Sequence, residues 1–305
     1  MQLQGTEIVD TFAEAFGMRY ARVIVTAEDE YWLEAAIREF TGYSSSVIAC
    51  DLETGLECRL APAATPDGRP GAAILLFGFS TDALAKAVPQ RVGQCVMTCP
   101  STALYDGLPD AEKTIPVGKN IRFFGDGYQK SKQVAGNRYW RVPVMDGEFL
   151  VVSTIGVEQG VAGGNVILQT RDKTSGLAAA RRGVEAVAEL PQVITPFPGG
   201  VARSGSKVGS QYKALPASTA DAYCPTLRGR VESQLHPDAH CAYEIVIDGI
   251  DEAAIGQAMT AAIQAAAGED VVAITAGNYG GKLGKHHFHL QQLLAENDAT
   301  AATEN

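Results

Sequence analysis

The sequence predicts an α+β fold of two ferredoxin-like lobes, each a split β-α-β arrangement, related by internal duplication. Three observations lead to this prediction. Strand-like and helix-like segments of the first half follow one another in the order β-α-β-β-α-β, and the second half repeats that order. A β-rich stretch at residues 121–154 joins the halves, and a length of 305 residues suits two domains or one duplicated fold. We expect an N-terminal lobe at residues 1–150 and a C-terminal lobe at residues 151–305.

Hydrophobic periodicity identifies the elements of the N-terminal lobe. Residues 30–41 carry Trp32, Ala36 and Phe40 at helical spacing, and the uninterrupted apolar run at residues 72–78 is typical of a buried strand. The predicted elements, in chain order, are a strand at 20–27, a helix at 30–41, strands at 47–50 and 72–78, a helix at 81–88 and a strand at 94–98.

The C-terminal lobe repeats this order around a long insertion. Its second helix begins near Asp251, whose negative charge suits the positive end of a helix. The polar residues 296–305 are expected to be disordered. A cleft between two such lobes would be the natural ligand site. The predicted elements are a strand at 164–170, a helix at 175–189, strands at 192–195 and 241–248, a helix at 251–267 and a strand at 271–275.

The segment 196–225 interrupts the second lobe and has no regular period. It is rich in Gly, Pro and Ser, yet Phe197, Tyr212 and Tyr223 give it surface to bury. A stretch of about 30 residues without secondary structure is rare inside a compact domain and is usually functional or disordered. We therefore predict an ordered, glycine-shaped loop that holds a ligand against the second half of the chain.

The composition excludes several classes of protein. A net charge of -10 and a pI near 5.0 argue against nucleic-acid and membrane-surface binding. The N-terminus lacks the regions of a secretion signal, and the longest apolar stretch, at residues 72–79, is too short to span a bilayer. None of the six cysteines forms a C-x-x-C pair. Because a chain of this length needs no disulfides, we expect reduced cysteines and a cytoplasmic location.

Familiar cofactor and metal motifs are incomplete. Lys130 stands where a dinucleotide-binding fingerprint needs its third glycine, and Leu283 replaces the Ser or Thr of a phosphate loop. The histidine-rich tract 286–289 could suggest a metal. In a strand, however, only His287 and His289 share a face, and no H-E-x-x-H motif accompanies them. We expect a surface or interface strand there and no metal site.

Glu244 is the residue best placed to carry chemistry. In the predicted strand CAYEIVID its neighbours on the same face are Ala242 and Val246, and it follows the long loop closely. Burial raises the pKa of a carboxyl group toward neutrality, which suits a general acid or base. The alternative is an exposed glutamate on the solvated face of a sheet, and the pattern alone leaves both interpretations open.

Three other polar residues also have two interpretations each. Asp126, between two glycines, suits either a ligand contact or a turn. Asn165 and Asn278 follow glycines in the similar sequences AGGN and AGN, and they suit turns or strand edges. Their correspondence fits the duplication.

Ten short stretches, several of them long for a motif and chemically unusual, are distributed in order along almost the whole chain from Gly5 to Leu290. They are DTFAEAF (10–16), TPDGRPG (65–71), GQCVMT (93–98), FFGDGYQ (123–129), GVAGGN (160–165), PFPGG (196–200), SKVGS (206–210), LPASTADAYCPT (215–226), YEIVI (243–247) and AGNYGGKLG (276–284). In this order they closely resemble the formylmethanofuran:tetrahydromethanopterin formyltransferase family.

The resemblance implies a soluble acyltransferase of one-carbon metabolism with two ferredoxin-like lobes. It would move a formyl group between N5 of tetrahydromethanopterin and the primary amine of a methanofuran or methylofuran coenzyme, through a tetrahedral intermediate. Glu244 falls at the position of the family's proposed catalytic carboxylate and would act as general acid and base. Both coenzymes would be substrates, and neither a metal nor a tightly bound cofactor is implied.

The resemblance also implies that the Gly-rich segments bind the coenzymes. Arg203, Lys207, Lys213 and Lys282 would offset the anionic groups of these coenzymes within an acidic chain. The residues expected at the coenzymes are Gly125, Asp126, Gly127, Tyr128, Gly163, Gly164, Asn165, Phe197, Pro198, Gly199, Arg203, Ser206, Lys207, Ser210, Tyr212, Ser218, Asp221, Tyr223, Asn278 and Lys282.

Members of the family are typically homotetramers with the active site near subunit contacts. Abundant Ala and few dense Glu/Lys runs favour a bacterial, methylotroph version, which would be the formyltransferase subunit of a formyltransferase/hydrolase complex in the oxidation of formaldehyde to formate. Formyl would pass from formyl-tetrahydromethanopterin to methylofuran, and a partner metallo-hydrolase would release formate. The alternatives are a non-catalytic coenzyme-binding or scaffold subunit of such a complex, and a stand-alone formyl hydrolase, which lacks support from any metal or nucleophile motif.

Overall fold

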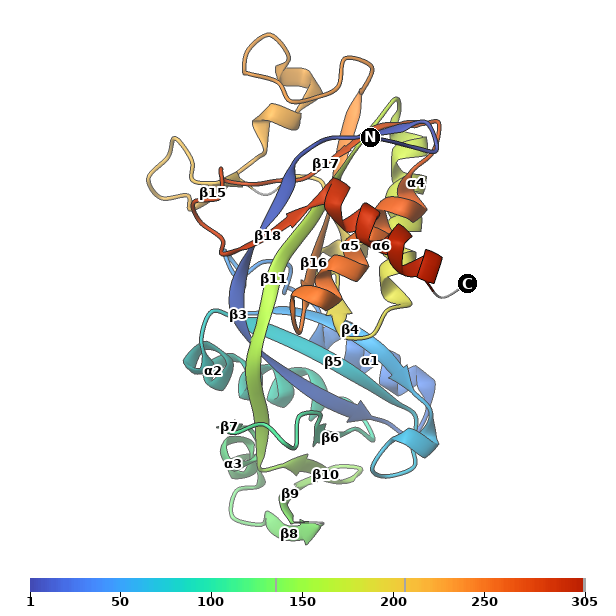
Figure 1. Ribbon diagram of the computed structural model, residues 1–305. Coiled ribbons are helices and arrows are strands. Elements are labelled where there is room, and N and C mark those ends of the chain that lie inside the picture. The colour runs from blue at the N-terminus through green and yellow to red at the C-terminus, as the bar shows by residue number, and fades with distance from the viewer. Residues whose placement is uncertain (135, 206, 304–305) are drawn as a thin grey trace. The chain divides into compact units, whose positions relative to one another are not determined.

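The chain forms two compact units that are both mixed α and β. Unit 1 comprises Met1–Gly17 and Val161–Asn305, and unit 2 comprises Met18–Gly160. The predicted lobes assign residues 1–17 and 151–160 differently, and the division into those lobes stays a prediction. The computed structural model in Figure 1 describes residues 1–134, 136–205 and 207–303.

The core of unit 2 is an antiparallel sheet covered by two helices. Its main elements are β3 (Phe12–Thr26), α1 (Glu30–Phe40), β4 (Glu53–Leu60), β5 (Gly71–Gly78), α2 (Thr81–Arg91) and β6 (Ala103–Asp106). The strands lie in the order β6-β3-β5-β4, and each neighbouring pair is antiparallel. Phe40 of α1 and Leu84 of α2 pack with Val23, Ile74 and Leu104 of the sheet in one buried core.

The rest of unit 2 extends this sheet. The further elements are β7 (Lys113–Pro116), α3 (Gly118–Ile121), β8 (Lys130–Val134), β9 (Asn137–Val144), β10 (Gly147–Val152) and the start of β11 (Thr154–Thr170). Strand β10 pairs in parallel with β6 and in antiparallel with β9, β8 pairs with β9, and β7 pairs with β11.

Unit 1 has a sheet of the same strand order. Its central elements are the end of β11, α4 (Lys173–Ala188), β12 (Val193–Ile194), β16 (Cys241–Gly249), α5 (Glu252–Ala266) and β17 (Val271–Thr275). The strands lie in the order β17-β11-β16-β12, again with antiparallel neighbours. Ala180 of α4 and Met259 of α5 pack with Val166 and Ile245 of the sheet in one buried core, and both helices lie on the same side of these strands (Figure 1).

Additional elements complete unit 1 at the two ends of the chain. They are β1 (Gln2–Leu3), β2 (Thr6–Ile8), β18 (His286–His289) and α6 (Leu290–Thr303). Strand β2 pairs in parallel with β17, and β18 pairs in antiparallel with the first residues of β3. Helix α6 includes the part of the tail up to Thr303 that was predicted to be disordered. Residues 304–305 lie outside the described part of the chain.

Two predicted strands of the first half are wrong. Residues 47–50 form a turn in which Cys50 N donates to Ser46 O at 2.8 Å, and the strand follows as β4. Residues 94–98 fall at a π-helical turn, where Met97 N donates to Val92 O at 2.9 Å. A short apolar run does not by itself distinguish a strand from a helical turn, and this explains both errors.

The long segment 196–225 is built from very short elements, as its composition predicts. They are β13 (Val201–Ala202), β14 (Lys207–Val208), β15 (Ala217–Ser218) and the 3₁₀ turns Pro198–Gly200 and Asp221–Tyr223. Strand β13 pairs with β16, and β14 pairs with β15 as a hairpin. The segment is therefore attached to the edge of the unit 1 sheet.

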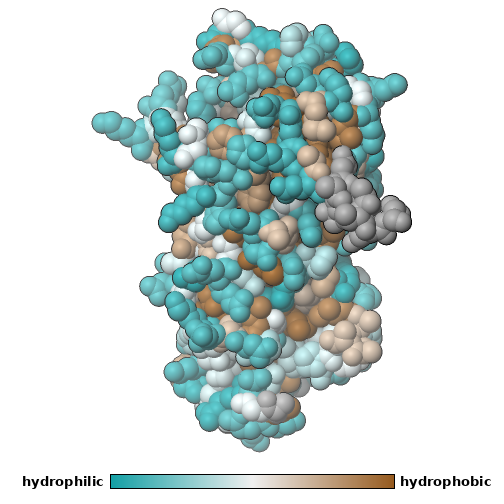
Figure 2. All heavy atoms as spheres, in the orientation of Figure 1, coloured by the Kyte–Doolittle hydropathy of each residue, from teal (hydrophilic) through white to brown (hydrophobic). Residues whose placement is uncertain are grey.

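The described residues include no helix that is long and apolar enough to cross a membrane. The face of the molecule in Figure 2 carries mainly hydrophilic side chains, with small hydrophobic patches between them. Scattered apolar residues of this kind are normal on a protein surface.

Asp251 caps the N-terminus of α5, because its Oδ1 accepts a hydrogen bond from Ala254 N at 2.8 Å. We expect Asp251→Ala to lower the free energy of unfolding by about 1 kcal/mol, since one N-terminal donor of the helix loses its partner. Asp251→Asn keeps the acceptor and should retain most of this stability. Urea unfolding followed by circular dichroism measures both, and equal stability of Asp251→Ala and the unmodified protein would contradict the capping role.

Candidate active site

Glu244 lies on β16, the strand between β11 and β13, with Ile167 and Ala202 as its cross-strand partners. Ile245 and Ile247 point into the core beneath the helices, so the alternation predicted for this strand places Glu244 on the opposite face. Glu244 is nevertheless only 2% exposed, because the long segment covers that face. The interpretation of Glu244 as an exposed surface residue is therefore wrong.

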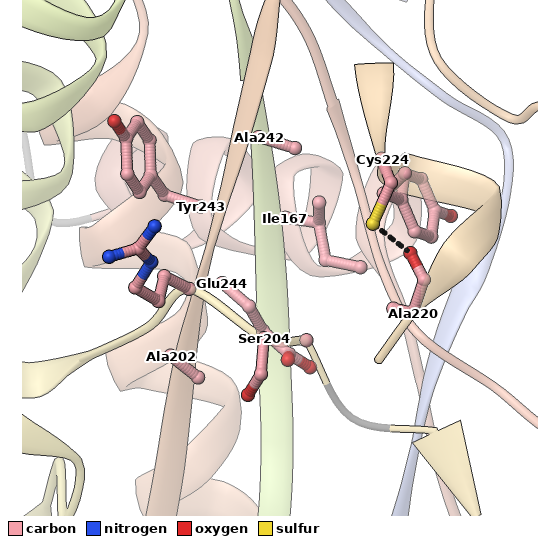
Figure 3. Close-up of a pocket in the computed structure, with 11 residues that line it drawn as sticks. Ile167, Ala202, Ser204, Ala220, Cys224, Ala242, Tyr243 and Glu244 are labelled. Atoms are coloured by element: carbon pink, nitrogen blue, oxygen red, sulfur yellow. Dashed lines mark hydrogen bonds between the residues drawn. The ribbon is translucent and has the colours of Figure 1, made fainter. Parts of the chain in front are cut away.

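A small cavity of about 30 Å³ lies against Glu244. Figure 3 shows that Tyr243 and Glu244 leave the strand on opposite sides, and that Glu244 points toward Ser204 of the long segment. Across the cavity, Cys224 Sγ donates to Ala220 O at 3.5 Å. The lining residues are Ile167, Ala202, Arg203, Ser204, Gly205, Ala220, Tyr223, Cys224, Ala242, Tyr243 and Glu244.

A larger cavity of about 450 Å³ adjoins the small one, because Ile167, Ala220 and Tyr223 line both. Its volume is in the usual range for small-molecule sites. Its wall comes from three segments of unit 1: residues 9–11 near the N-terminus, the long segment at 220–223, and the loop after β17 at 275–279. Gln169 of β11 and Gln234 complete this wall with Lys207.

The backbone at Gly277 approaches Glu244 closely. A Cβ atom at this glycine would lie 3.7 Å from Glu244 Oε1 and 3.4 Å from Asn165 Oδ1. Asn165, which is 5% exposed, holds Gly277 with both ends of its amide: Gly277 N donates to Oδ1 at 2.6 Å, and Nδ2 donates to Gly277 O at 3.2 Å. The side chain of Asn165 thus positions the wall of the cavity, which is more than the turn or strand-edge role considered from sequence.

The negative charge of Glu244 contributes to raised pKa values of two tyrosines. Burial, together with the negative charges of Glu244 and Glu14, raises the pKa of Tyr279 to about 12. Burial and the charge of Glu244 also raise the pKa of Tyr223. Both tyrosines line the larger cavity and remain protonated at neutral pH, so they are neutral hydrogen-bond donors in its wall.

The basic residues of the long segment lie near these cavities. Lys207 Nζ and Asp221 Oδ1 form an ion pair at 2.8 Å on the wall of the larger cavity. Arg203 is exposed and lines the small cavity. Lys282 is exposed in the loop between β17 and β18. Lys213 lies on the exposed part of the segment.

Two of the predicted glycines shape the backbone of β11. Gly163, at φ 92°, donates its N–H to Asp248 Oδ1 at 3.0 Å. A side chain at Gly164 would overlap Ile255 of α5. Both positions therefore serve the packing of unit 1.

Other predicted residues of unit 1 hold loops together. Ser218 Oγ donates to Gly209 O at 2.8 Å, and Ser210 Oγ accepts from Tyr212 N at 3.1 Å. Asn278 Nδ2 donates to Phe12 O at 3.1 Å. The start of the long segment is a 3₁₀ turn that involves Phe197, Pro198 and Gly199. Ser206 lies outside the described residues.

The predicted residues Gly125, Asp126, Gly127 and Tyr128 belong to unit 2, not to the unit that carries Glu244. They lie at the end of a 3₁₀ turn, and Asp126 adopts the left-handed conformation at φ 50°. Asp126 therefore occupies a turn, and its contact with a ligand stays a prediction. Tyr128 is 78% exposed.

Sequence reasoning missed Tyr279 and Glu14. Tyr279 follows Asn278 directly, and its place in a glycine-rich loop was the available signal. Glu14 is the acidic residue in the otherwise apolar strand sequence FAEAF. It went unnoticed because the strand was predicted to begin at residue 20, whereas β3 begins at Phe12.

Within residues 1–134, 136–205 and 207–303, no group of three or more His, Cys, Asp or Glu side chains is arranged to hold a metal ion. In the histidine tract, His286 Nδ1 contacts Glu252 Oε1, and His287 Nε2 contacts Gly284 O at 3.2 Å. The tract forms strand β18, as predicted.

This arrangement can move a proton. Glu244 sits on a strand that is paired on both sides, and it lines the small cavity, which adjoins a cavity of ligand size. A buried carboxylate in such a position can take a proton from a bound ligand and return it to another atom. The neutral phenols can donate hydrogen bonds to negative charge that develops on the ligand.

Comparisons with known proteins agree along almost the whole chain. Residues 1–144 match the family described as formylmethanofuran-tetrahydromethanopterin formyltransferase, and residues 147–293 match the proximal lobe of that family. The enzyme of this name from Methylococcus capsulatus is 52% identical, with 97% of this chain and 100% of the relative covered. A subunit of the formyltransferase/hydrolase complex from Methylorubrum extorquens is 47% identical, with 96% and 97% covered.

Two solved structures have the same fold. The formylmethanofuran:tetrahydromethanopterin formyltransferase from Methanosarcina barkeri superimposes with a TM-score of 0.91 at 44% identity, covering 96% of this chain and 100% of the other. The formyltransferase/hydrolase complex from Methylorubrum extorquens, solved with methylofuran, contains a chain with a TM-score of 0.93 at 46% identity, covering 96% and 98%. The chain belongs to the formylmethanofuran–tetrahydromethanopterin formyltransferase family.

Proposed function

We propose that this enzyme transfers a formyl group between N5 of tetrahydromethanopterin and the primary amine of a methanofuran-type coenzyme, with Glu244 as general acid and base. The observation that carries the proposal is the buried carboxylate of Glu244, which lines the small cavity next to the larger one. The names of the relatives, which include both coenzymes, support the substrates.

The reaction requires the transfer of one proton from the attacking amine to N5 of the pterin. The lone pair of the furan amine attacks the formyl carbon, a C–N bond forms, and the carbonyl oxygen takes the negative charge. Glu244 accepts a proton from the attacking nitrogen. The bond between the formyl carbon and N5 then breaks, the carbonyl re-forms, and Glu244 returns the proton to N5. The same steps run in reverse, so a single carboxylate serves both directions.

The oxyanion of the tetrahedral intermediate is stabilised by donors that are already in place. Tyr223 and Tyr279 line the larger cavity as protonated phenols. Fixed donors stabilise developing charge effectively because they need no reorganisation during the reaction.

The coenzyme-binding assignments remain part of this proposal. Lys207, Arg203 and Lys282 attract the anionic groups of the coenzymes, and Asn278, Asp221 and Tyr223 contribute to the cavity wall. The cavities of unit 1 supply no role for residues 125–128, which we assign to coenzyme binding from the resemblance alone. No metal and no prosthetic group take part in the proposed reaction.

We also propose that the fold arose by duplication of a ferredoxin-like split β-α-β unit. The strand orders β6-β3-β5-β4 and β17-β11-β16-β12 support this, since each places the last strand, then the first, third and second. In each unit a helix follows the first strand and another follows the third.

The relative in Methylorubrum extorquens is a subunit of a formyltransferase/hydrolase complex, and that complex was crystallised with methylofuran. We infer that this chain works in the cytoplasm in a similar assembly, as a homo-oligomer, with hydrolase subunits, or both. Formyl then passes from the pterin to the furan coenzyme, and the hydrolase subunits release it as formate.

The direct test is formyl exchange by the purified protein. The expected result is a change in pterin absorbance when formyl-tetrahydromethanopterin and the furan coenzyme are mixed with the protein. Binding of the furan coenzyme without exchange, even after partner subunits are added, would instead support a scaffold role. Release of formate by the isolated chain would support a hydrolase.

A further inference from the structure

The carboxylate of Glu14 accepts hydrogen bonds from four backbone N–H groups of a single loop. Its Oε2 accepts from Tyr279 N at 2.7 Å and Gly281 N at 2.8 Å, and its Oε1 accepts from Leu283 N and Gly284 N, both at 2.6 Å. Glu14 is 1% exposed and comes from β3, more than 260 positions earlier in the chain. The loop between β17 and β18 therefore folds around one buried anion.

The ionised form of Glu14 is the form that this loop stabilises. Burial opposes ionisation, but the four backbone hydrogen bonds outweigh it and lower the pKa of the carboxyl group below its ordinary value. Hydrogen bonds to a charged acceptor are about twice as strong as neutral ones. Removing the charge would leave several backbone donors without an acceptor.

Glycines make this convergence of N–H groups possible. Gly280 and Gly281 adopt left-handed conformations at φ 71° and 70°, which let the chain turn so that the N–H groups on either side of Gly280 reach Glu14. A Cβ atom at Gly284 would overlap Ala15 O and lie 2.8 Å from Glu14 Cγ. The sequence NYGGKLG thus has the shape needed to enclose a carboxylate.

The same loop forms one wall of the candidate active site. Gly277, Asn278 and Tyr279 line the larger cavity, and the phenol of Tyr279 responds to the charges of both Glu244 and Glu14. Tyr279 N is itself one of the four donors to Glu14. The position of Tyr279 in the wall of the larger cavity is therefore tied to the carboxylate of Glu14.

Glu14 is not itself placed for the chemistry. Both of its oxygens face the loop backbone, and it contributes to neither of the two cavities beside Glu244. A carboxylate that receives four N–H donors is a poor base, because those donors stabilise its ionised form. Its effect on the reaction must pass through the loop.

We propose that Glu14 is a positioning residue of the formyltransferase site, which holds the loop at residues 277–284 so that Tyr279 is fixed in the wall of the larger cavity, next to the small cavity that Glu244 lines. This inference rests on the proposed function and adds to it a residue that no sequence motif for catalysis contains. A misplacement of a catalytic donor by about 1 Å can cost about 100-fold in rate.

The test is a double-mutant cycle with Glu14→Gln and Tyr279→Phe, measured as kcat and KM for formyl exchange. Glutamine has almost the same size as glutamate. Its NH₂ group, however, cannot accept a hydrogen bond, so the two backbone N–H groups that it meets lose their acceptor. We expect Glu14→Gln to lower kcat by about 10- to 100-fold in the unmodified background. In the Tyr279→Phe background the same change should lower kcat by less than about threefold, because the hydroxyl that it displaces is already absent.

The matched control is Glu57→Gln. Glu57 is also a buried glutamate, 7% exposed, and its oxygens bind Arg22 Nε and Nη2 at 2.7 Å in unit 2. The Glu57→Gln variant should lose about as much stability as Glu14→Gln, while its kcat stays within about threefold of that of the unmodified protein. Thermal unfolding of every variant shows that it is folded at the assay temperature, so that kcat values are compared between folded proteins.

Two outcomes would overturn the inference. One is an unchanged kcat in Glu14→Gln while the unmodified protein is active. The other is an equal loss in both backgrounds, which indicates general destabilisation and no action through Tyr279. Absence of exchange by the unmodified protein would instead contradict the proposed function, so the two failures are distinguishable.

Discussion

Glu244→Gln is expected to lower kcat for formyl exchange by about 100- to 10,000-fold, the range that a general acid and base contributes. Glutamine keeps the shape and the polarity of the side chain but cannot accept and return the proton. The change should leave the dissociation constants of the coenzymes within a few-fold, because the cavity wall stays the same. Steady-state kinetics and isothermal titration calorimetry measure these two effects separately.

The fold should survive this substitution. Glu244 lies on a strand paired on both sides, and its backbone hydrogen bonds do not depend on the carboxylate. Thermal unfolding of Glu244→Gln is the control, with Glu57→Gln as a buried glutamate outside unit 1. A kcat within about threefold of the unmodified protein would remove the proton-transfer role from Glu244.

Gly284→Ala is expected to disturb both the stability and the activity. Its Cβ would overlap Ala15 O, so the loop must move away from β3 and from the carboxylate that its N–H groups contact. Overpacking of this kind costs about 1–3 kcal/mol of unfolding free energy. Because the loop also carries Tyr279, we expect kcat to fall by at least about tenfold.

Gly93→Ala is a suitable control for this prediction. Gly93 lies in the π-helical turn after α2, and apart from its chain neighbours and the backbone of its own turn, no atom lies within 4 Å of the position of an added Cβ. It should leave both urea unfolding and kcat nearly unchanged. A Gly284→Ala variant as stable and as active as Gly93→Ala would show that the close approach of the loop to β3 is unimportant.

The sequence predicts the parts of this fold that depend on local patterns. Strong periodicity gives α1, α4 and α5 to within a few residues, and uninterrupted apolar runs give β5 and β17. The pattern does not predict the end of α2, because the helix includes Pro89 and continues to Arg91. The guanidinium of Arg91 donates to the carbonyls of Phe40, Gly42 and Tyr43, a long-range contact that no local pattern reveals.

The residues of the candidate site likewise differ in how far a local sequence pattern reveals them. Strand alternation predicts the face on which Glu244 lies, but it leaves open whether that face is buried, and only the family resemblance singles out Glu244 as catalytic. The roles of Asn165 and Glu14 could not be predicted, since their partners lie more than 100 and more than 260 positions away. Both residues act by holding backbone groups, and a sequence does not show which backbone groups will meet a given side chain.

The proposed mechanism depends on a proton that Glu244 exchanges with the amine of the furan coenzyme. A crystal structure of this protein with that coenzyme bound tests it most directly, through the distance from the nearer carboxylate oxygen of Glu244 to the amine nitrogen. We expect about 3 Å, or one bridging water between the two atoms, as a general base requires. An amine bound away from Glu244, with no water connecting them, would contradict the mechanism.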